Sequence, residues 1–478
     1  MARLDEDYEV VVIDEIQMIG DRDRGYAWSR ALMGLRCKEV HVCGGLEAKE
    51  VVEKIVADSG DEFSLNEYKR FNELVIADEP LNKQADYSNV QKGDCVVAFS
   101  KNCIFAIRKE IESTTGMKCC VVYGSLPPET RAAQARLFND PDSGYDILVA
   151  SDAIGMGLNL NIRRVIFHTI YKSDGTKIVR LDHSSLKQIA GRAGRRASHW
   201  GGYGEVTCRR KEDMAYLQAG MPRNIRSLDR AGLLPTVEHI EGFSDSLTND
   251  GGVVLMMQDL LTKFESLSRI NEQEYFLCKQ ATISHIAAIL EGIPLSLSDK
   301  FVLSTAPANT NDDPAMELIR DYAKAFANEK PFGLHVNIPL TPPESFEQLG
   351  QLCSKHNLLD LYIWLALRYP GKNDIEIINV QRQKVALITV IDDALARNSA
   401  TRGGKGGGEG GGACQSGEEI LPALKLKHDY NFHDERIRGF YQKWVYQNGE
   451  MTFEEAFGEL PEVVEVGVVE VEEVKAVA

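Results

Sequence analysis

The sequence predicts an α/β fold of doubly wound parallel sheets, the first of them truncated, followed by an α-helical carboxy-terminal domain. Between Asp94 and Met221, apolar runs alternate with helical segments, which is the pattern of β-α-β units in a parallel sheet. After about Pro222 the strand signals fade, and helical runs such as Leu358 to Tyr369 replace them. At 478 residues the chain is also too long for one core and indicates about three domains.

The first part, residues 1–77, is expected to be an incomplete α/β domain. Val10 to Ile13 is a continuous apolar run, typical of a strand covered on both faces of a parallel sheet. A helix near Gly25 to Leu35 and a strand at Glu39 to Cys43 follow. Because no domain of this kind starts naturally at such a strand, we expect upstream sequence to be missing. The first eight residues are acidic, unlike a targeting segment.

The second part, residues 78–221, is expected to be a complete α/β domain that begins with a connector at Asp78 to Ser88. Its crossovers should be right-handed. The expected strands are Cys95 to Phe99, Lys118 to Tyr123, Ile147 to Ala150 and Arg164 to His168, and the expected helices are Asn102 to Ser113, Glu129 to Phe138 and Ser184 to Ala193.

The remaining chain divides into a helical domain at 222–398, a glycine-rich linker at 399–418 and an acidic tail at 419–478. Helices are expected at Leu358 to Tyr369, which Pro370 ends, and at Val385 to Arg397. The formal net charge of -17 argues at first against a nucleic-acid partner. However, residues 450–478 contain nine glutamates and a single basic residue, Lys475, so much of the acidity lies in the tail.

The composition excludes two classes of protein. No stretch of about eighteen uncharged apolar residues occurs, so we expect no membrane span. The ten cysteines form no C-x-x-C pair and no grouping at zinc-ligand spacing, which favours reduced, buried thiols in a reducing compartment.

Asp14 and Glu15 are candidate ligands for a divalent cation. They follow the apolar Val10 to Ile13 run, and ligands of open parallel sheets collect at the carboxyl ends of the strands. An aspartate there can hold Mg²⁺ through water, and the next carboxylate can orient or deprotonate an attacking water. Alone the pair is weak evidence, because such a pair after an apolar run is more often a solvated strand end.

The string Gln188-Ile-Ala-Gly-Arg192-Ala-Gly-Arg195 is more specific. Two arginines three apart share one helical face, and the glycines permit close approach, which suits phosphate binding across a cleft. The alternative is a basic surface helix whose small residues pack on a neighbour.

Three further turns point to phosphate or nucleic-acid contact. Residues 146–160 are an apolar strand that runs into a turn rich in Asp and Gly, where backbone N–H groups can approach a phosphate. The other two turns are Ser100-Lys101 and Gly124-Ser125, on the same edge of the sheet. Serines at such points can also simply cap helices, and for Ser125 that alternative stays open.

In this order, the segments resemble motifs II to VI of superfamily two helicases. They are DEIQ at 14–17, HVCGG at 41–45, VVAFSK at 96–101, VVYGSLPPET at 121–130, ILVASDAIGMGLNL at 147–160 and QIAGRAGRR at 188–196. Within this superfamily the chain resembles the mitochondrial degradosome RNA helicases, the Suv-three type of DExH protein. The resemblance covers roughly Tyr8 to Arg397, including RAGLLPT at 230–236 and IPLSL at 293–297.

The resemblance implies RecA-like domains, ATP and Mg²⁺ as ligands, and a role for each matching residue. Asp14 and Glu15 would hold Mg²⁺ and activate water, and Gln17 would link the nucleotide and RNA sites. Arg192 and Arg195 would contact the γ-phosphate, with Arg195 as arginine finger and Gln188 orienting the helix. Gly155 and Gly157 would lie at the nucleotide, while these residues would track the RNA: Ser100, Lys101, Gly124, Ser125, Asp152 and Asn159.

The sequence departs from the family pattern at two motifs. Motif I is a phosphate loop that ends in Gly-Lys-Ser/Thr, and the printed sequence has none. Gly371-Lys372-Asn373 and Gly404-Lys405-Gly406 lack the hydroxyl. In motif III, Gly45 stands where the family usually has an acid.

Two functions therefore compete. One, which the resemblance implies, is an ATP-dependent RNA helicase that unwinds RNA in the 3′ to 5′ direction, with DNA as a further candidate substrate, and works with an exoribonuclease in the mitochondrial matrix. The other is an ATPase-deficient isoform or fragment that only binds RNA or a partner. The resemblance favours the first for the family, and the missing phosphate loop favours inactivity of these 478 residues.

Overall fold

The computed structural model describes residue 4 and residues 6–400, apart from 156, 174–176, 196–199, 201, 224, 250–254, 340, 344 and 370–372. The glycine-rich stretch at 401–412 and the expected acidic tail at 419–478 lie outside the described residues.

The first part of the chain builds a small parallel sheet. Strand β1 (Asp7–Ile13) pairs with β2 (Arg36–Val42), and Val11 lies opposite Val40. Helix α1 (Gly25–Gly34) connects the two strands after a 3₁₀ turn, η1 (Ile16–Gly20). A second 3₁₀ turn, η2 (Leu46–Ala48), leads into α2 (Lys49–Ser59), which the sequence patterns did not indicate.

The expectation that Val10 to Ile13 is covered on both faces is wrong in this structure. Val10 is 53% exposed and Val12 is 65% exposed, while Ile13 is buried. The reason is that alternate residues of a strand point to opposite faces. Helices α1 and α2 share a hydrophobic cluster with Val11 and Ile13, which lie on one face of β1. Within the described ranges β1 pairs with β2 alone.

The second sheet has six parallel strands in the order β3-β10-β7-β4-β6-β5. This confirms the parallel α/β architecture and the four strands expected between Asp94 and His168. Two further strands, β3 at the edge and β10 beside it, were not expected. Since β3 lies before residue 78, the sheet extends into the segment assigned to the first domain. The strands are β3 (Glu73–Ile76), β4 (Asp94–Val97), β5 (Lys118–Val122), β6 (Tyr145–Ala150), β7 (Arg164–Phe167) and β10 (Tyr203–Cys208).

Helices cover both faces of this sheet, as a doubly wound fold requires. Val96 and Val121 belong to one hydrophobic cluster with α3, whereas Val97 and Val122 belong to another with α4, α5 and α6. The helices are α3 (Lys101–Thr115), α4 (Pro128–Asn139), α5 (His183–Ala190) and α6 (Lys211–Gly220), and a hairpin of β8 (Tyr171–Ser173) and β9 (Ile178–Arg180) precedes α5.

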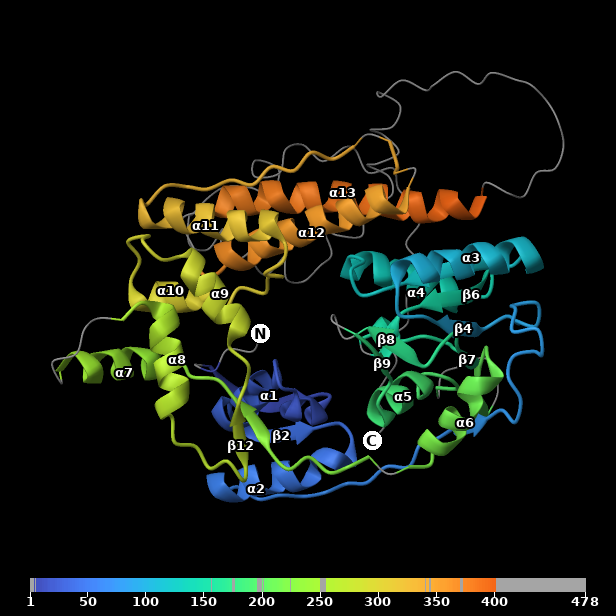
Figure 1. Cartoon of the computed structure of the whole chain (residues 1–478), viewed down its shortest axis with the longest axis horizontal. Helices are drawn as coiled ribbons and strands as arrows, with labels where there is room; N and C mark the ends of the chain where they lie inside the picture. Colours follow the sequence, from blue (N-terminus) through green and yellow to red (C-terminus); the bar gives the residue numbers. More distant parts are fainter. Residues whose placement is uncertain are drawn as a thin grey trace. The chain divides into compact units, whose positions relative to one another are not determined.

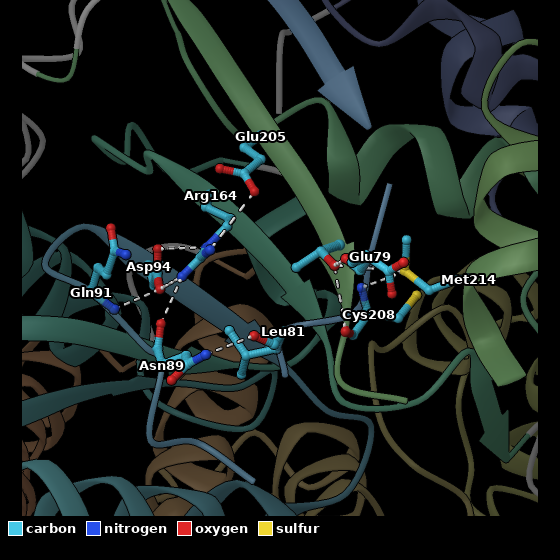
Figure 2. Close-up of polar contacts among 10 residues, drawn as sticks. Glu79, Leu81, Asn89, Gln91, Asp94, Arg164, Glu205, Cys208 and Met214 are labelled. Atoms are coloured by element: carbon cyan, nitrogen blue, oxygen red, sulfur yellow. Dashed lines mark hydrogen bonds and ion pairs between the residues drawn. The ribbon is translucent and has the colours of Figure 1, made fainter. Parts of the chain in front are cut away.

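A buried ion pair joins the amino ends of the central strands (Figure 2). Asp94 begins β4 and is fully buried, and Arg164 begins β7 beside it. The Arg164 guanidinium donates from Nε to Asp94 Oδ1 at 3.1 Å and from Nη2 to Asp94 Oδ2 at 2.6 Å. Its Nη1 lies 3.7 Å from Glu205 Oε1. The pair lies at the amino ends of β4 and β7, away from the edge where the strands end.

The part after Pro222 is helical, as expected, except for a short parallel pair of strands, β11 and β12. Helices α12 and α13 run side by side (Figure 1). A capping box of Ser345 and Gln348 starts α12. Within the described ranges, no helix is both long and apolar enough to cross a membrane. The elements are β11 (Ala231–Leu233), α7 (Val237–Asn249), α8 (Met257–Leu267), β12 (Tyr275–Leu277), α9 (Ala281–Ile289), α10 (Leu297–Ser304), α11 (Asp313–Ala327), α12 (Phe346–Ala366) and α13 (Asp374–Ala400).

The helical part packs on α3 of the second sheet. The ring of Phe105 on α3 stacks on Phe346 at the start of α12, with 4.0 Å between the centroids. Arg108, also on α3, donates to the carbonyl of Leu395 on α13 at 3.0 Å. Side chains of both parts therefore share one hydrophobic cluster.

The expected burial of the cysteines holds for most of those described. Cys95, Cys119, Cys120 and Cys208 lie in the second sheet and are buried, and burial raises the pKa of the Cys120 thiol to about 12. Cys43, at the end of β2, is exposed, against the expectation.

Candidate functional site

Asp14 and Glu15 directly follow β1, at its carboxyl end. The Glu15 backbone has φ 53° and ψ 47°, the left-handed conformation that a residue with a side chain rarely adopts. Asp14 Oδ1 accepts a hydrogen bond from the Glu15 backbone N–H at 2.8 Å. The Asp14 carbonyl accepts another from the indole of Trp28 at 2.9 Å. These contacts hold a strained turn that presents two adjacent carboxylates, as is common at functional sites.

Gln17 ties this acidic pair to the HVCGG turn after β2. Its Nε2 donates to Glu15 Oε2 at 2.5 Å, and its Oε1 accepts from the Gly45 backbone N–H at 3.1 Å. A Cβ atom at Gly44 would stand 2.3 Å from the same Oε1, so only glycine leaves room for this contact. Gln17 thus bridges the two turns.

The arginine loop, which we define as residues 191–195, follows α5. Asp182 caps α5 by accepting from the Ser185 N–H at 2.8 Å. Arg192 is 6% exposed, and its Nη2 lies 3.8 Å from Glu15 Oε1. Burial, with the nearby charge of Arg195, lowers the pKa of Arg192 to about 10, although Glu15 and Asp14 oppose this shift. The structure therefore brings the acidic pair and Arg192 together from positions far apart in the sequence.

This arrangement suits a phosphate chain carrying a divalent cation. Carboxylate oxygens are the ligands that Mg²⁺ prefers, and Asp14 and Glu15 supply them. Arg192 is nearly buried, yet within the described part of the chain its guanidinium makes only the long contact with Glu15. A guanidinium has five donors that match phosphate oxygens. The residues present therefore fit both Mg²⁺ and a nucleotide phosphate.

The strand ends that carry the predicted RNA contacts lie at one edge of the second sheet. Ala150 at the end of β6 is paired with Val97 of β4 and with Val122 of β5. The turns after these strands, which hold Ser100, Gly124 and Asp152, consequently begin side by side. Asp152 and Gly124 are exposed, as contact with a ligand requires.

The two serines of this edge differ in their roles. Ser100 Oγ accepts from the Cys103 N–H at 3.2 Å and so caps α3. Ser125 caps no helix, because the capping position of α4 is Pro127. Its hydroxyl is buried and has no hydrogen-bond partner among the described residues. The Lys101 ammonium lies 5.6 Å from the centre of the Tyr123 ring.

The turn after β6 approaches helix α5. A Cβ atom at Gly155 would lie 3.8 Å from the Gln188 side chain, so Gln188 packs against this turn. Gly157 has φ 71°, the region that favours glycine, and the space beside it is open. Further on, the Asn159 carbonyl accepts from Asn139 Nδ2 at 2.9 Å, which fixes its backbone.

Sequence patterns missed two residues that touch the arginine loop, Arg70 and Asn72. Arg70 donates to the carbonyls of Gly191 at 3.2 Å and of Ala193 at a shorter distance. Asn72 donates from Nδ2 to the carbonyl of Gly194 at 3.0 Å. No motif spacing indicates such contacts, because side chains of one segment bind backbone atoms of another more than a hundred positions away.

Models of protein families match three parts of the chain. They are the DEXQ-box helicase domain of Suv3 at residues 1–68, the helicase conserved C-terminal domain at 78–197, and the Suv3 C-terminal domain 1 at 285–327.

The chain is also similar to curated proteins over most of its length. It is 37% identical to the mitochondrial ATP-dependent RNA helicase SUV3 of Oryza sativa subsp. japonica, covering 85% of this chain and 69% of that protein. It is 42% identical to the mitochondrial helicase DExH18 of Arabidopsis thaliana, covering 77% of this chain and 46% of that one. It is 38% identical to human mitochondrial SUPV3L1, covering 77% and 47%. The chain thus spans about half the length of several of these relatives.

Proposed function

The chain belongs to the Suv3 family of helicases, and from this premise we propose that it serves the ATP-dependent unwinding of RNA. The observation that carries the proposal is the 3.8 Å approach of Arg192 Nη2 to Glu15 Oε1. This contact places the acidic end of one sheet against the arginine loop of the other. Relative movement of the two parts would then depend on what occupies the space between them.

ATP would be held from both sides of this contact. Asp14 and Glu15 would hold Mg²⁺, which neutralises phosphate charge when bound. Arg192 and Arg195 would contact the γ-phosphate, whose oxygens carry the charge during phosphoryl transfer. Gln188 would keep α5 against the turn of Gly155 and Gly157, near the nucleotide.

RNA would lie along the edge formed by the ends of β4, β5 and β6. Lys101 supplies a charge for the phosphate backbone, and the exposed Gly124 lets that backbone come close. The residues proposed to track RNA are Ser100, Lys101, Gly124, Ser125, Asp152 and Asn159. Gln17 would carry changes at Glu15 to the turn at Gly45. By resemblance we propose that the chain moves along RNA in the 3′ to 5′ direction.

The cellular role is proposed from the relatives, which are named as mitochondrial RNA helicases. We place this chain in the mitochondrial matrix, in RNA surveillance and decay with an exoribonuclease partner, as in a degradosome.

A second function is favoured by one observation in the sequence. The printed residues contain no Gly-Lys-Ser/Thr phosphate loop, since Gly404-Lys405 is followed by glycine. Without a lysine and a backbone cradle, the γ-phosphate has Arg192 and Arg195 on one side and no matching anchor on the other. These 478 residues would then bind RNA or a partner protein without RNA-stimulated hydrolysis.

Binding of a labelled single-stranded RNA to the full chain tests the main proposal. We expect Mg·ATP to change the RNA affinity of the wild type by several-fold, since ligands of two coupled sites alter each other's affinity. Arg192→Gln should abolish this change. Arg226→Gln is the control, because Arg226 is an exposed arginine that pairs with the nearby Asp229. RNA affinity that is absent, or indifferent to ATP, would contradict the proposal.

Phosphate release decides between the two functions. Because these 478 residues carry no phosphate loop, we expect no RNA-stimulated release from them, which favours the second function for the chain as printed, while ATP-dependent unwinding is proposed as the family role. Release that RNA stimulates and that Asp14→Asn abolishes would show that these residues suffice for hydrolysis, and the second function would be wrong.

A further inference from the structure

The segment that joins the two sheets closes on the arginine loop. Arg70 and Asn72 immediately precede β3, the edge strand of the second sheet. Arg70 donates from Nε to the carbonyl of Asn72 at 2.8 Å, so the two residues brace each other. Arg70 also donates to the carbonyls of Gly191 and Ala193. Asn72 donates to those of Gly194 and Arg195, at 3.0 and 3.2 Å.

These bonds satisfy the loop's backbone from one side. The loop amides are bound elsewhere: the Gly191 N–H donates to the Lys187 carbonyl at 2.7 Å, and the Gly194 N–H to that of Ile162 at 2.7 Å. Arg70 and Asn72 supply the donors that the loop carbonyls need. Asn72 is 7% exposed, so water could not easily replace it.

From this geometry we propose that Arg70 and Asn72 are positioning residues of the nucleotide site, which hold the loop so that Arg192 and Arg195 face the phosphates. The inference rests on the proposed ATP site. Arg70 itself does not reach the ligand, because its guanidinium already binds three carbonyl groups.

The charges of the cluster support a positioning role. Burial, and then the charge of Arg195, lower the pKa of Arg70. The charge of Arg195 thus acts on both Arg70 and Arg192. Carbonyl oxygens stabilise Arg70 in place, which leaves the other two for an anion.

Arg70 and Asn72 lie in the segment that connects the two sheets. The segment before Arg70 leads back to α2 of the first sheet, and the residues after it enter the second sheet. The pair thus couples the joint between the two α/β parts to the residues that would contact ATP.

The test uses the full chain and four variants. Arg70→Gln removes the charge and the fork of donors, and Arg70→Lys keeps the charge but not the fork. Asn72→Ala removes the other two bonds and serves if the Arg70 variants fail to fold. Lys69→Gln is the matched control, because Lys69 is the exposed neighbour in the same segment.

Amide hydrogen exchange of residues 191–195, without nucleotide, reports on the loop itself. We expect Arg70→Gln, Arg70→Lys and Asn72→Ala to accelerate it about tenfold, since each removes bonds worth roughly one factor of ten. Lys69→Gln should leave it unchanged. Unchanged exchange in the three variants overturns the proposal.

Binding of Mg·ATP reports on positioning. The three variants should weaken it about tenfold, whereas Lys69→Gln should not. Full ATP affinity in Arg70→Lys would show that the charge alone matters. Faster amide exchange of the loop with unchanged ATP affinity in the variants would show that order in the loop is irrelevant to the site. Either result overturns the inference. If the wild type binds no ATP, the proposed function fails, and hydrogen exchange alone still decides whether the pair holds the loop.

Discussion

Removing Asp94 should destabilise the second sheet more than removing any surface charge. Its carboxylate accepts from Arg164 Nε at 3.1 Å and Nη2 at 2.6 Å, and from the Gln91 N–H at 2.8 Å. Asp94→Ala leaves the Arg164 side chain, which is 10% exposed, with the Asn89 carbonyl at 3.2 Å and Glu205 at 3.7 Å. Loss of one partner of a buried pair costs about 3 to 5 kcal/mol. Glu205 compensates in part, so we expect about 3 kcal/mol.

The free energy of unfolding is measured in urea on the full chain. The probe is hydrogen exchange at the amides of β4 and β7, because several domains can unfold separately. Replacing both partners, Asp94→Leu with Arg164→Met, should restore most of the loss, since no charge is then buried alone. The control is Asp229→Ala in the exposed pair with Arg226, expected to cost roughly 0 to 1 kcal/mol. A cost below about 1 kcal/mol for Asp94→Ala, or a double variant no better than the single one, would refute the reasoning.

Two further predictions concern α13 and the arginine loop. Burial raises the pKa of Asp392 from 3.8 to about 6, so the folded chain binds this proton more tightly than the unfolded chain. The stability that the bound proton contributes is complete below about pH 4 and is lost as pH rises to about 6. Asp392→Asn should therefore be more stable than wild type at pH 7.5, by about 1 to 2 kcal/mol in urea unfolding, and a smaller difference at pH 4 is part of the prediction. Gly194 has φ 61°, and its added Cβ would stand 2.3 Å from the Gly204 backbone nitrogen, so Gly194→Ala should displace the loop and abolish ATP binding. Gly116→Ala, with φ 74° but open space, should cost only about 1 kcal/mol and leave binding intact, and equal effects of the two would contradict the packing argument.

The central sheet could be predicted from sequence because its strands are covered on both faces. Continuous apolar runs such as Cys119 to Val122 and Ile147 to Ala150 have few alternatives to a buried strand. β10 (Tyr203–Cys208) carries Gly204 and Glu205 among its apolar residues, and β3 is not fully buried on either face, so neither had a comparable signal. The prediction for the run Val10 to Ile13 was wrong. Its composition indicates a strand with two covered faces, but burial depends on which strands and helices lie beside it.

The candidate site was predictable where side chains themselves carry the chemistry. Asp14, Glu15 and Arg192 follow the family order of motifs, and the structure brings them together. Gln17 contacts Glu15 and Gly45, and the link between nucleotide and RNA sites that the resemblance implies for it stays a prediction. Arg70 was invisible, because its partners are backbone carbonyls, which leave no trace in a sequence.

The claim that the acidic pair and the arginine loop hold the same nucleotide is tested most directly by calorimetric titration of the full chain with ATP, with and without Mg²⁺. The account predicts that Mg²⁺ strengthens ATP binding in the wild type, that Asp14→Asn removes this dependence, and that Arg192→Gln weakens binding by about tenfold or more. In the double variant the two losses should not add, since both residues act on one ligand. ATP binding that is unaffected by both substitutions would contradict the account, because the nucleotide would then lie elsewhere on the chain.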